Sequence, residues 1–81
     1  MIALDFLKKK NKYLIELGKK IKQIRKDRGL SQEQLALKAE VDRSYMGGIE
    51  RGERNVSFLT LTKLAICLNC DIAEFTKGIP K

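Results

Sequence analysis

Four residues that favour the start of a helix divide this chain: Ser31, Asp42, Ser57 and Asp71. The side-chain oxygen of such a residue can accept a hydrogen bond from one of the first unpaired amides of a helix. The segments after the first three carry apolar residues three and four positions apart, a spacing that places them on one helix face. No segment alternates apolar and polar residues over the length of a strand. The sequence therefore predicts an all-α fold built from short helices.

An apolar stripe predicts a longer helix before these four segments. The stripe has spacings of three, four and three residues, and lysines fall largely on the other faces. We expect this helix to run from Tyr13 to Arg28 and to stop at Gly29. Residues 1–12 are expected to form either a basic N-terminal arm or an upstream extension of the same helix. The stripe consists of Leu14, Leu17, Ile21 and Ile24.

Four further helices follow from the capping residues. The segment SQEQ, which begins at Ser31, has the form of a capping box and opens the second helix. The third helix begins after Asp42, the fourth after Ser57, and a short fifth runs from Asp71 through Lys77. The chain is thus predicted to form a compact five-helix domain over residues 13–79. The expected inward-facing residues of helices two to four are Leu35, Ala36, Ala39, Met46, Ile49, Leu61, Leu64, Ala65 and Leu68.

The composition excludes several functional classes. The length of 81 residues is about that of one small domain and leaves little room for a buried catalytic cavity. The chain has no histidine, and its carboxylates lie where they cap helices or form ion pairs, so we expect no enzyme. Cys67 and Cys70 lack the further ligands that a zinc site within one subunit needs. We therefore expect inert thiols, no metal and no cofactor.

The expected location is the cytoplasm. The opening residues MIALDF are too few for the core of a signal peptide and already contain Asp5. No apolar run approaches the roughly 18 residues of a membrane span. Two cysteines three positions apart cannot form the disulfide framework of a small secreted domain.

The charge of the chain indicates a polyanionic partner. The formal net charge is +7, and residues 1–30 hold ten of the lysines and arginines against three carboxylates. A basic protein of this size is suited to nucleic acid or to an anionic membrane surface. Charge alone leaves both partners open.

Residues 32–51 have the pattern of a helix-turn-helix. Small Ala36 lies where two short helices that cross steeply would have to approach closely. The second helix of the pair exposes an unusual set of residues and contains the adjacent glycines Gly47 and Gly48. Each glycine is expected to cost a helix roughly 1 kcal/mol relative to alanine. The exposed residues are Arg43, Ser44, Tyr45, Gly47 and Arg51.

Two segments carry a resemblance to a known family: IRKDRGLSQEQLA and YMGGIERGERNVS. In this order, across Leu17 to Phe75, they resemble the Cro and phage-repressor (Xre-type) helix-turn-helix domain. The stretch DRSYMGGIERGERN is most similar to the controller proteins of restriction-modification systems. The resemblance implies a sequence-specific DNA-binding regulator that acts as a homodimer on a near-palindromic operator.

The resemblance also implies roles for individual residues. It makes Asp42 to Arg51 the recognition helix, whose N-terminal end faces base edges in the major groove. Tyr45 would contact a sugar or a thymine methyl, or would pack within the protein. The residues expected at base edges are Arg43, Ser44, Tyr45 and Gly47, and those expected at phosphates are Gln32, Arg51, Arg54 and Asn55.

Three structural features accompany these roles. Glu50 resembles a family glutamate that pairs with an arginine of the first helix, here Arg25, and so orients the recognition helix. Glu40 stands where the family usually has glycine, which implies either a positive φ or a wider turn. The homodimer interface is expected on the fourth and fifth helices at Leu68, Ile72, Phe75 and Ile79.

The two glycines are expected to serve different purposes. Gly47 would let the helix backbone lie deep against base pairs, and Gly48 would permit close helix packing. Two tolerated small residues on a marginal helix are the alternative.

Other functions share part of this pattern. An antitoxin-type or phage-type repressor would have the same fold. A different class, a membrane-surface protein with residues 1–26 as a basic amphipathic helix on anionic lipid, would explain the lysines but not the second motif.

Overall fold

The computed structural model describes residues 11–80, which form five helices and contain no strand. The predicted all-α class is therefore confirmed. Residues 1–10, which make up most of the predicted arm or helix extension over residues 1–12, lie outside the described residues. Asn11 caps the first described helix, which starts at Lys12. The helices are α2 (Lys12–Asp27), α3 (Gln32–Ala39), α4 (Arg43–Glu50), α5 (Phe58–Leu68) and α6 (Ile72–Thr76).

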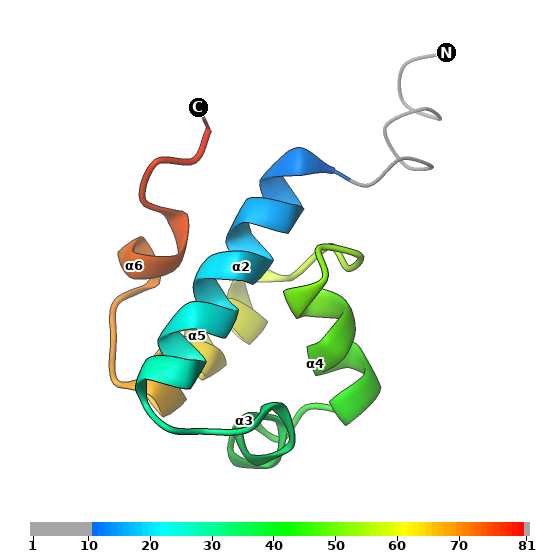
Figure 1. Ribbon diagram of the computed structural model, residues 1–81, viewed down its shortest axis with the longest axis vertical. Helices are drawn as coiled ribbons and strands as arrows, with labels where there is room; N and C mark the ends of the chain where they lie inside the picture. The colour runs from blue at the N-terminus through cyan, green and yellow to red at the C-terminus, as the bar shows by residue number, and fades with distance from the viewer. Residues whose placement is uncertain (1–10, 81) are drawn as a thin grey trace.

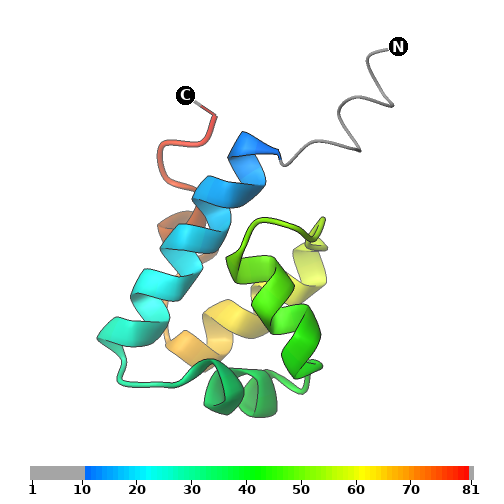
Figure 2. The same ribbon diagram turned by 45° about the vertical axis from the view of Figure 1, so that its right-hand side comes forward.

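The longest helix, α2, occupies the middle of the arrangement. Figure 1 shows α6 on one side of α2 and α4 on the other, and α2 packs against both. The shorter α3 lies across the N-terminal end of α4, and it also contacts α5 (Figure 2). Because α2 and α3 pack against its inner side, α4 is left with one side open to solvent.

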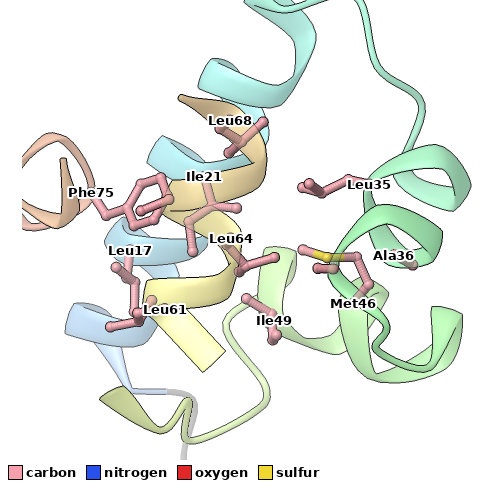
Figure 3. Close-up of a cluster of buried hydrophobic side chains, with 12 residues drawn as sticks. Leu17, Ile21, Leu35, Ala36, Met46, Ile49, Leu61, Leu64, Leu68 and Phe75 are labelled. Carbon is pink, nitrogen blue, oxygen red and sulfur yellow. The ribbon is translucent and has the colours of Figure 1, made fainter. Parts of the chain in front are cut away.

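One apolar cluster holds the helices together. The side chains of α2, α4, α5 and α6 converge on a common centre, where Ile21 and Leu64 are fully buried (Figure 3). Burial of a side chain of this size contributes roughly 1.5–3 kcal/mol. The largest fully buried side chains are Phe75, Ile21, Leu35, Met46, Ile49, Leu64 and Leu68.

This burial corrects part of the predicted dimer interface. Leu68 and Phe75 are 1% and 0% exposed within a single chain, so they have no surface to offer a partner. The prediction for these two residues was wrong because α5 and α6 turn them inward, into the cluster that contains Ile21. Ile72 and Ile79 are only partly buried against the same cluster.

Side-chain caps fix most helix starts. The Oγ of Ser31 accepts a hydrogen bond from the Gln34 amide at 3.0 Å, and the Gln34 Oε1 accepts one from the Ser31 amide at 2.7 Å. Asp42 and Ser57 cap α4 and α5 by accepting hydrogen bonds from the amides of Tyr45 and Thr60. These predicted caps are confirmed. Asp71 differs, because its side chain makes no cap hydrogen bond.

The turn between α3 and α4 is tight despite its lack of glycine. Glu40 adopts the left-handed conformation with φ 57°, as predicted. The amide of Val41 then donates to the carbonyl of Ala36 at 3.0 Å, which closes the helix end. Asn69 repeats this geometry at the end of α5 with φ 54°. The wider turn that was the alternative for Glu40 is not observed.

Candidate nucleic-acid interface

A buried carboxylate fixes the C-terminal end of α4. Glu50 receives two hydrogen bonds from the Arg25 guanidinium of α2, from Nε to Oε2 at 2.7 Å and from Nη2 to Oε1 at 3.0 Å. The two side chains are only 8% and 2% exposed. The Nη1 of Arg25 donates to the carbonyl of Leu30 at 2.8 Å. The predicted ion pair between Arg25 and Glu50 is therefore present, and it ties α4 directly to α2.

Gln32 joins this network. Its Nε2 donates to the Oε1 of Glu50 at 3.0 Å, so the first residue of α3 is connected to the last residue of α4. The sequence prediction placed this side chain on a DNA phosphate and did not foresee the internal contact. One amide hydrogen is used inside the protein, while the carboxamide has two. Glu50 thus links three helices through charge-assisted hydrogen bonds.

A glycine that sequence reasoning did not single out sets the distance between α2 and α4. A Cβ on Gly18 would lie 2.4 Å from the carbonyl oxygen of Ile49 and 2.6 Å from that of Glu50. Gly52 makes a similar approach with φ 77°, where a Cβ would lie 2.6 Å from the Cα of Ile15. The signal in the sequence was position: Gly18 lies on the buried stripe of α2, four residues after Leu14.

The N-terminal end of α4 presents three of the four predicted base-contacting residues, whereas the fourth, Gly47, is buried. Arg43 and Ser44 are exposed, and Tyr45 is partly buried. Asp42 accepts a hydrogen bond from the Tyr45 amide at 3.2 Å, which holds the first turn in place. The structure thus brings these three side chains to one end of a capped and anchored helix.

The predicted phosphate-contacting residues flank the other end of α4. Arg51 is exposed and its Nε donates to Glu53 at 3.0 Å. Arg54 and Asn55 lie in the exposed loop that follows. The guanidinium of Arg54 turns back toward α4 and lies 5.8 Å from the centre of the Tyr45 ring, a cation–π contact.

The two glycines of α4 are covered by these same polar side chains. Gly47 and Gly48 are buried. A Cβ on Gly47 would lie 3.0 Å from the Nη1 of Arg51 and 3.3 Å from the Oε1 of Gln32. The three nearest atoms to a Cβ on Gly48 all belong to Arg54. Gly48 was predicted to permit close packing between helices. Its nearest neighbours instead belong to the loop residue Arg54, and the close approach between helices occurs at Gly18.

The cysteines lie away from this surface. Cys67 and Cys70 are free and partly buried against the core. Burial raises the pKa of the Cys70 thiol, which keeps it protonated at neutral pH. Within residues 11–80 no group of three or more potential ligands is arranged to hold a metal ion.

These features define the class of protein. Two short helices joined by a three-residue turn, with the second helix anchored on its inner side and polar on its outer side, form a helix-turn-helix. A family profile described as Helix-turn-helix matches residues 21–75.

Known proteins narrow the class. The chain is 39% identical to control protein C.MunI of Mycoplasma sp over 72 residues, which cover 88% of this chain and 97% of that protein. It is 46% identical to the immunity repressor protein of Bacillus phage phi105 over 57 residues, or 70% of this chain and 40% of that repressor. The crystal structure of the restriction-modification controller protein C.AhdI from Aeromonas hydrophila superposes with a TM-score of 0.75 and 45% identity, covering 76% of this chain and 94% of that one.

The chain therefore belongs to the helix-turn-helix family. It is a DNA-binding regulator closely related to the controller proteins of restriction-modification systems. The predicted family resemblance is confirmed.

Proposed function

We propose that this protein binds a near-palindromic operator as a homodimer and places α4 of each subunit in a major groove. The observation that carries the proposal is the contrast within α4. Its exposed N-terminal end holds Arg43 and Ser44, while its other end is fixed by the buried pair of Arg25 and Glu50. A helix held in this way can present side chains to base edges with a defined orientation.

Arg43 is the proposed main base contact. A guanidinium at the start of a recognition helix can donate two hydrogen bonds to the O6 and N7 atoms of guanine, worth roughly 1–3 kcal/mol of discrimination. Ser44 can bond to a neighbouring base or phosphate. Tyr45, which is partly buried, would contact a sugar or a thymine methyl at the edge of this surface.

The proposed phosphate contacts surround these residues. Gln32 lies at the N-terminal end of α3, where the helix dipole favours an anion. Arg51 is paired with Glu53 on the surface, but an exposed pair of this kind contributes little and can give way to a phosphate. Arg54 and Asn55 would contact the backbone from the loop.

A different surface supports the proposed homodimer. Three bulky apolar side chains of α5 are largely exposed: Phe58 at 68%, Leu59 at 74% and Ile66 at 73%. Leu59 and Ile66 are two helical turns apart and so lie on one face. We place the two-fold interface on this face, with Ile72 and Ile79 at its margin. Two copies of α4 would then enter successive major grooves about 34 Å apart.

Selection from random duplex DNA tests the proposal. The purified protein is incubated with a pool of random duplexes, and the bound fraction is sequenced over several rounds. We expect a short motif that is repeated with two-fold symmetry, at a spacing of about one helical turn or a multiple of it. No enrichment over the starting pool would contradict sequence-specific binding.

The burial of the apolar stripe of α2 argues against the membrane alternative. This alternative requires the apolar stripe of α2 to face lipid, but Leu17 and Ile21 are buried in the core. Within residues 11–80 there is also no helix long and apolar enough to cross a membrane. Sedimentation with anionic vesicles, compared with a shift assay on duplex DNA, separates the two functions: we expect binding to DNA only.

A phage-type repressor with the same fold remains the second candidate. The similarity to the phi105 immunity repressor favours it, although this chain spans only 40% of that protein's length. Genomic fragments recovered with the protein would discriminate the two. We expect an operator upstream of the protein's own gene, next to restriction-modification genes, whereas an operator among phage genes would favour the second candidate.

A further inference from the structure

The space above Gly48 is occupied by the side chain of Arg54. A Cβ on Gly48 would lie 2.8 Å from the Cγ, 3.1 Å from the Nε and 3.5 Å from the Cδ of Arg54. These are the three nearest atoms, so an added methyl group would meet the Arg54 side chain first. Gly48 is buried although it lies on the outer side of α4, and the atoms nearest to an added Cβ are those of Arg54.

The far end of Arg54 reaches Tyr45. Its guanidinium lies 5.8 Å from the centre of that ring, one helical turn before Gly48. The amide of Glu53 donates to the carbonyl of Gly48 at 2.9 Å, so the loop that carries Arg54 is itself attached at Gly48. The backbone next to Arg54 is therefore attached to α4, and its side chain runs through the space left by Gly48 to the Tyr45 ring.

We propose that Gly48 is a positioning residue for Arg54, and that it directs the Arg54 guanidinium along α4 onto Tyr45 so that it can bind a DNA phosphate. This inference rests on the proposed DNA-binding function. Any Cβ at position 48 would displace the methylene chain of Arg54, and the guanidinium would leave the ring. A long flexible side chain in a loop would otherwise have to be ordered on binding, at a cost in conformational entropy.

A double-mutant cycle tests the inference. The affinities of Gly48→Ala, Arg54→Ala and the double variant are measured on the selected operator and on an unrelated duplex. We expect each single variant to lose about tenfold on both duplexes, because a phosphate contact carries no sequence information. We expect the double variant to be no weaker than Arg54→Ala. The negative slope of log K against log salt should become shallower by about 0.9 per subunit in all three variants.

The thermal unfolding of Gly48→Ala distinguishes a positioning role of Gly48 from a purely structural one. If the glycine were needed only for packing, the substitution would lower the Tm. Alanine is the better helix former, and the neighbouring atoms belong to a flexible side chain. We therefore expect a Tm equal to or above that of the unsubstituted protein, together with weaker binding. A lowered Tm, together with additive effects of Gly48→Ala and Arg54→Ala on affinity, would overturn the proposal.

Gly47→Ala is the matched control. It makes the same chemical change in the same helix, but its nearest neighbours are Arg51 and Gln32. Its effect on affinity should add to that of Arg54→Ala, since the two positions share no contact.

The free protein offers a test without DNA. The Tyr45 ring should shift the NMR signals of the Arg54 side-chain protons upfield, and Gly48→Ala should abolish this shift. Additive effects of Gly48→Ala and Arg54→Ala, or an unchanged shift, would overturn the inference while DNA binding by the unsubstituted protein remained. Absence of DNA binding by the unsubstituted protein would instead contradict the proposed function.

Discussion

The inner side of α4 is apolar and buried, whereas its outer side carries exposed polar side chains. The inner side buries Met46 and Ile49 completely and touches the backbone of α2 at Gly18. The outer side exposes Arg43 and Ser44. A helix of eight residues is too short to be stable or to hold an orientation by itself. The comparison shows that contacts on one side fix the direction of the other, so the outer side can be given over to a ligand.

Breaking the inner side at Glu50 should have the largest effect. The substitution Glu50→Ala leaves the Arg25 guanidinium buried without its partner. We expect the free energy of unfolding to fall by about 3–5 kcal/mol, measured by urea denaturation. A loss below about 1 kcal/mol would show that the pair does not hold α4.

Replacing both residues of the ion pair by apolar ones separates its effect on stability from its effect on the orientation of α4. The double variant Arg25→Met with Glu50→Leu removes both charges and keeps similar volumes, so it should recover most of the lost stability. Operator affinity should not recover with it, because Gln32 also loses its partner on α4. Full recovery of affinity would show that the polar network has no part in orienting the helix.

The next largest effect should come from Gly18→Ala. Its Cβ would meet two backbone carbonyls, at 2.4 Å and 2.6 Å, and neither can move without shifting α4. We expect a loss of about 3 kcal/mol in thermal or urea unfolding. The control is Gly48→Ala, in which the added methyl meets only a flexible side chain. Equal stability of the two variants would contradict the close backbone approach.

On the outer side, Arg43→Ala should change binding and leave folding alone. Because the side chain is exposed, the free energy of unfolding should stay within about 0.5 kcal/mol. Repeating the site selection with this variant should relax the preference at one base position per half-site, by roughly 1–3 kcal/mol. Uniformly weaker binding to all sequences would place Arg43 on a phosphate instead.

The smallest effect on the fold is expected at Ile66. The substitution Ile66→Glu puts a charge on the exposed face of α5 and should yield a folded monomer, as measured by sedimentation velocity and circular dichroism. Leu37→Glu is the control, because Leu37 is equally exposed at 78% but belongs to α3. A dimer that survives Ile66→Glu would place the interface elsewhere.

The sequence was sufficient for the fold because its signals are local. Capping residues such as Ser31 and Ser57 act within one helical turn, and the apolar spacing of each helix is visible without its neighbours. The pair of Arg25 and Glu50 could be predicted only through the family resemblance, because nothing local connects residues 25 positions apart.

The roles of the helical glycines and the position of the dimer interface could not be predicted, because they depend on tertiary packing. The roles of Gly18 and Gly48 follow from which atoms face them. Gly18 lies on the buried stripe of α2, but that position does not reveal how closely α4 approaches it. Leu68 and Phe75 were placed at an interface because an apolar residue on a helix does not reveal whether its own chain or a second copy covers it. Exposure in the folded chain, as for Ile66, supplies that information.

We infer that the outer side of α4 binds DNA while its inner side stays on the core. Titration of the isotope-labelled protein with the selected operator, followed by two-dimensional NMR, tests it most directly. We expect the largest shifts at Arg43, Ser44 and Arg54, and unchanged hydrogen-exchange protection at Met46 and Ile49. Shifts confined to the lysines of α2, with the signals of α4 unmoved, would contradict it.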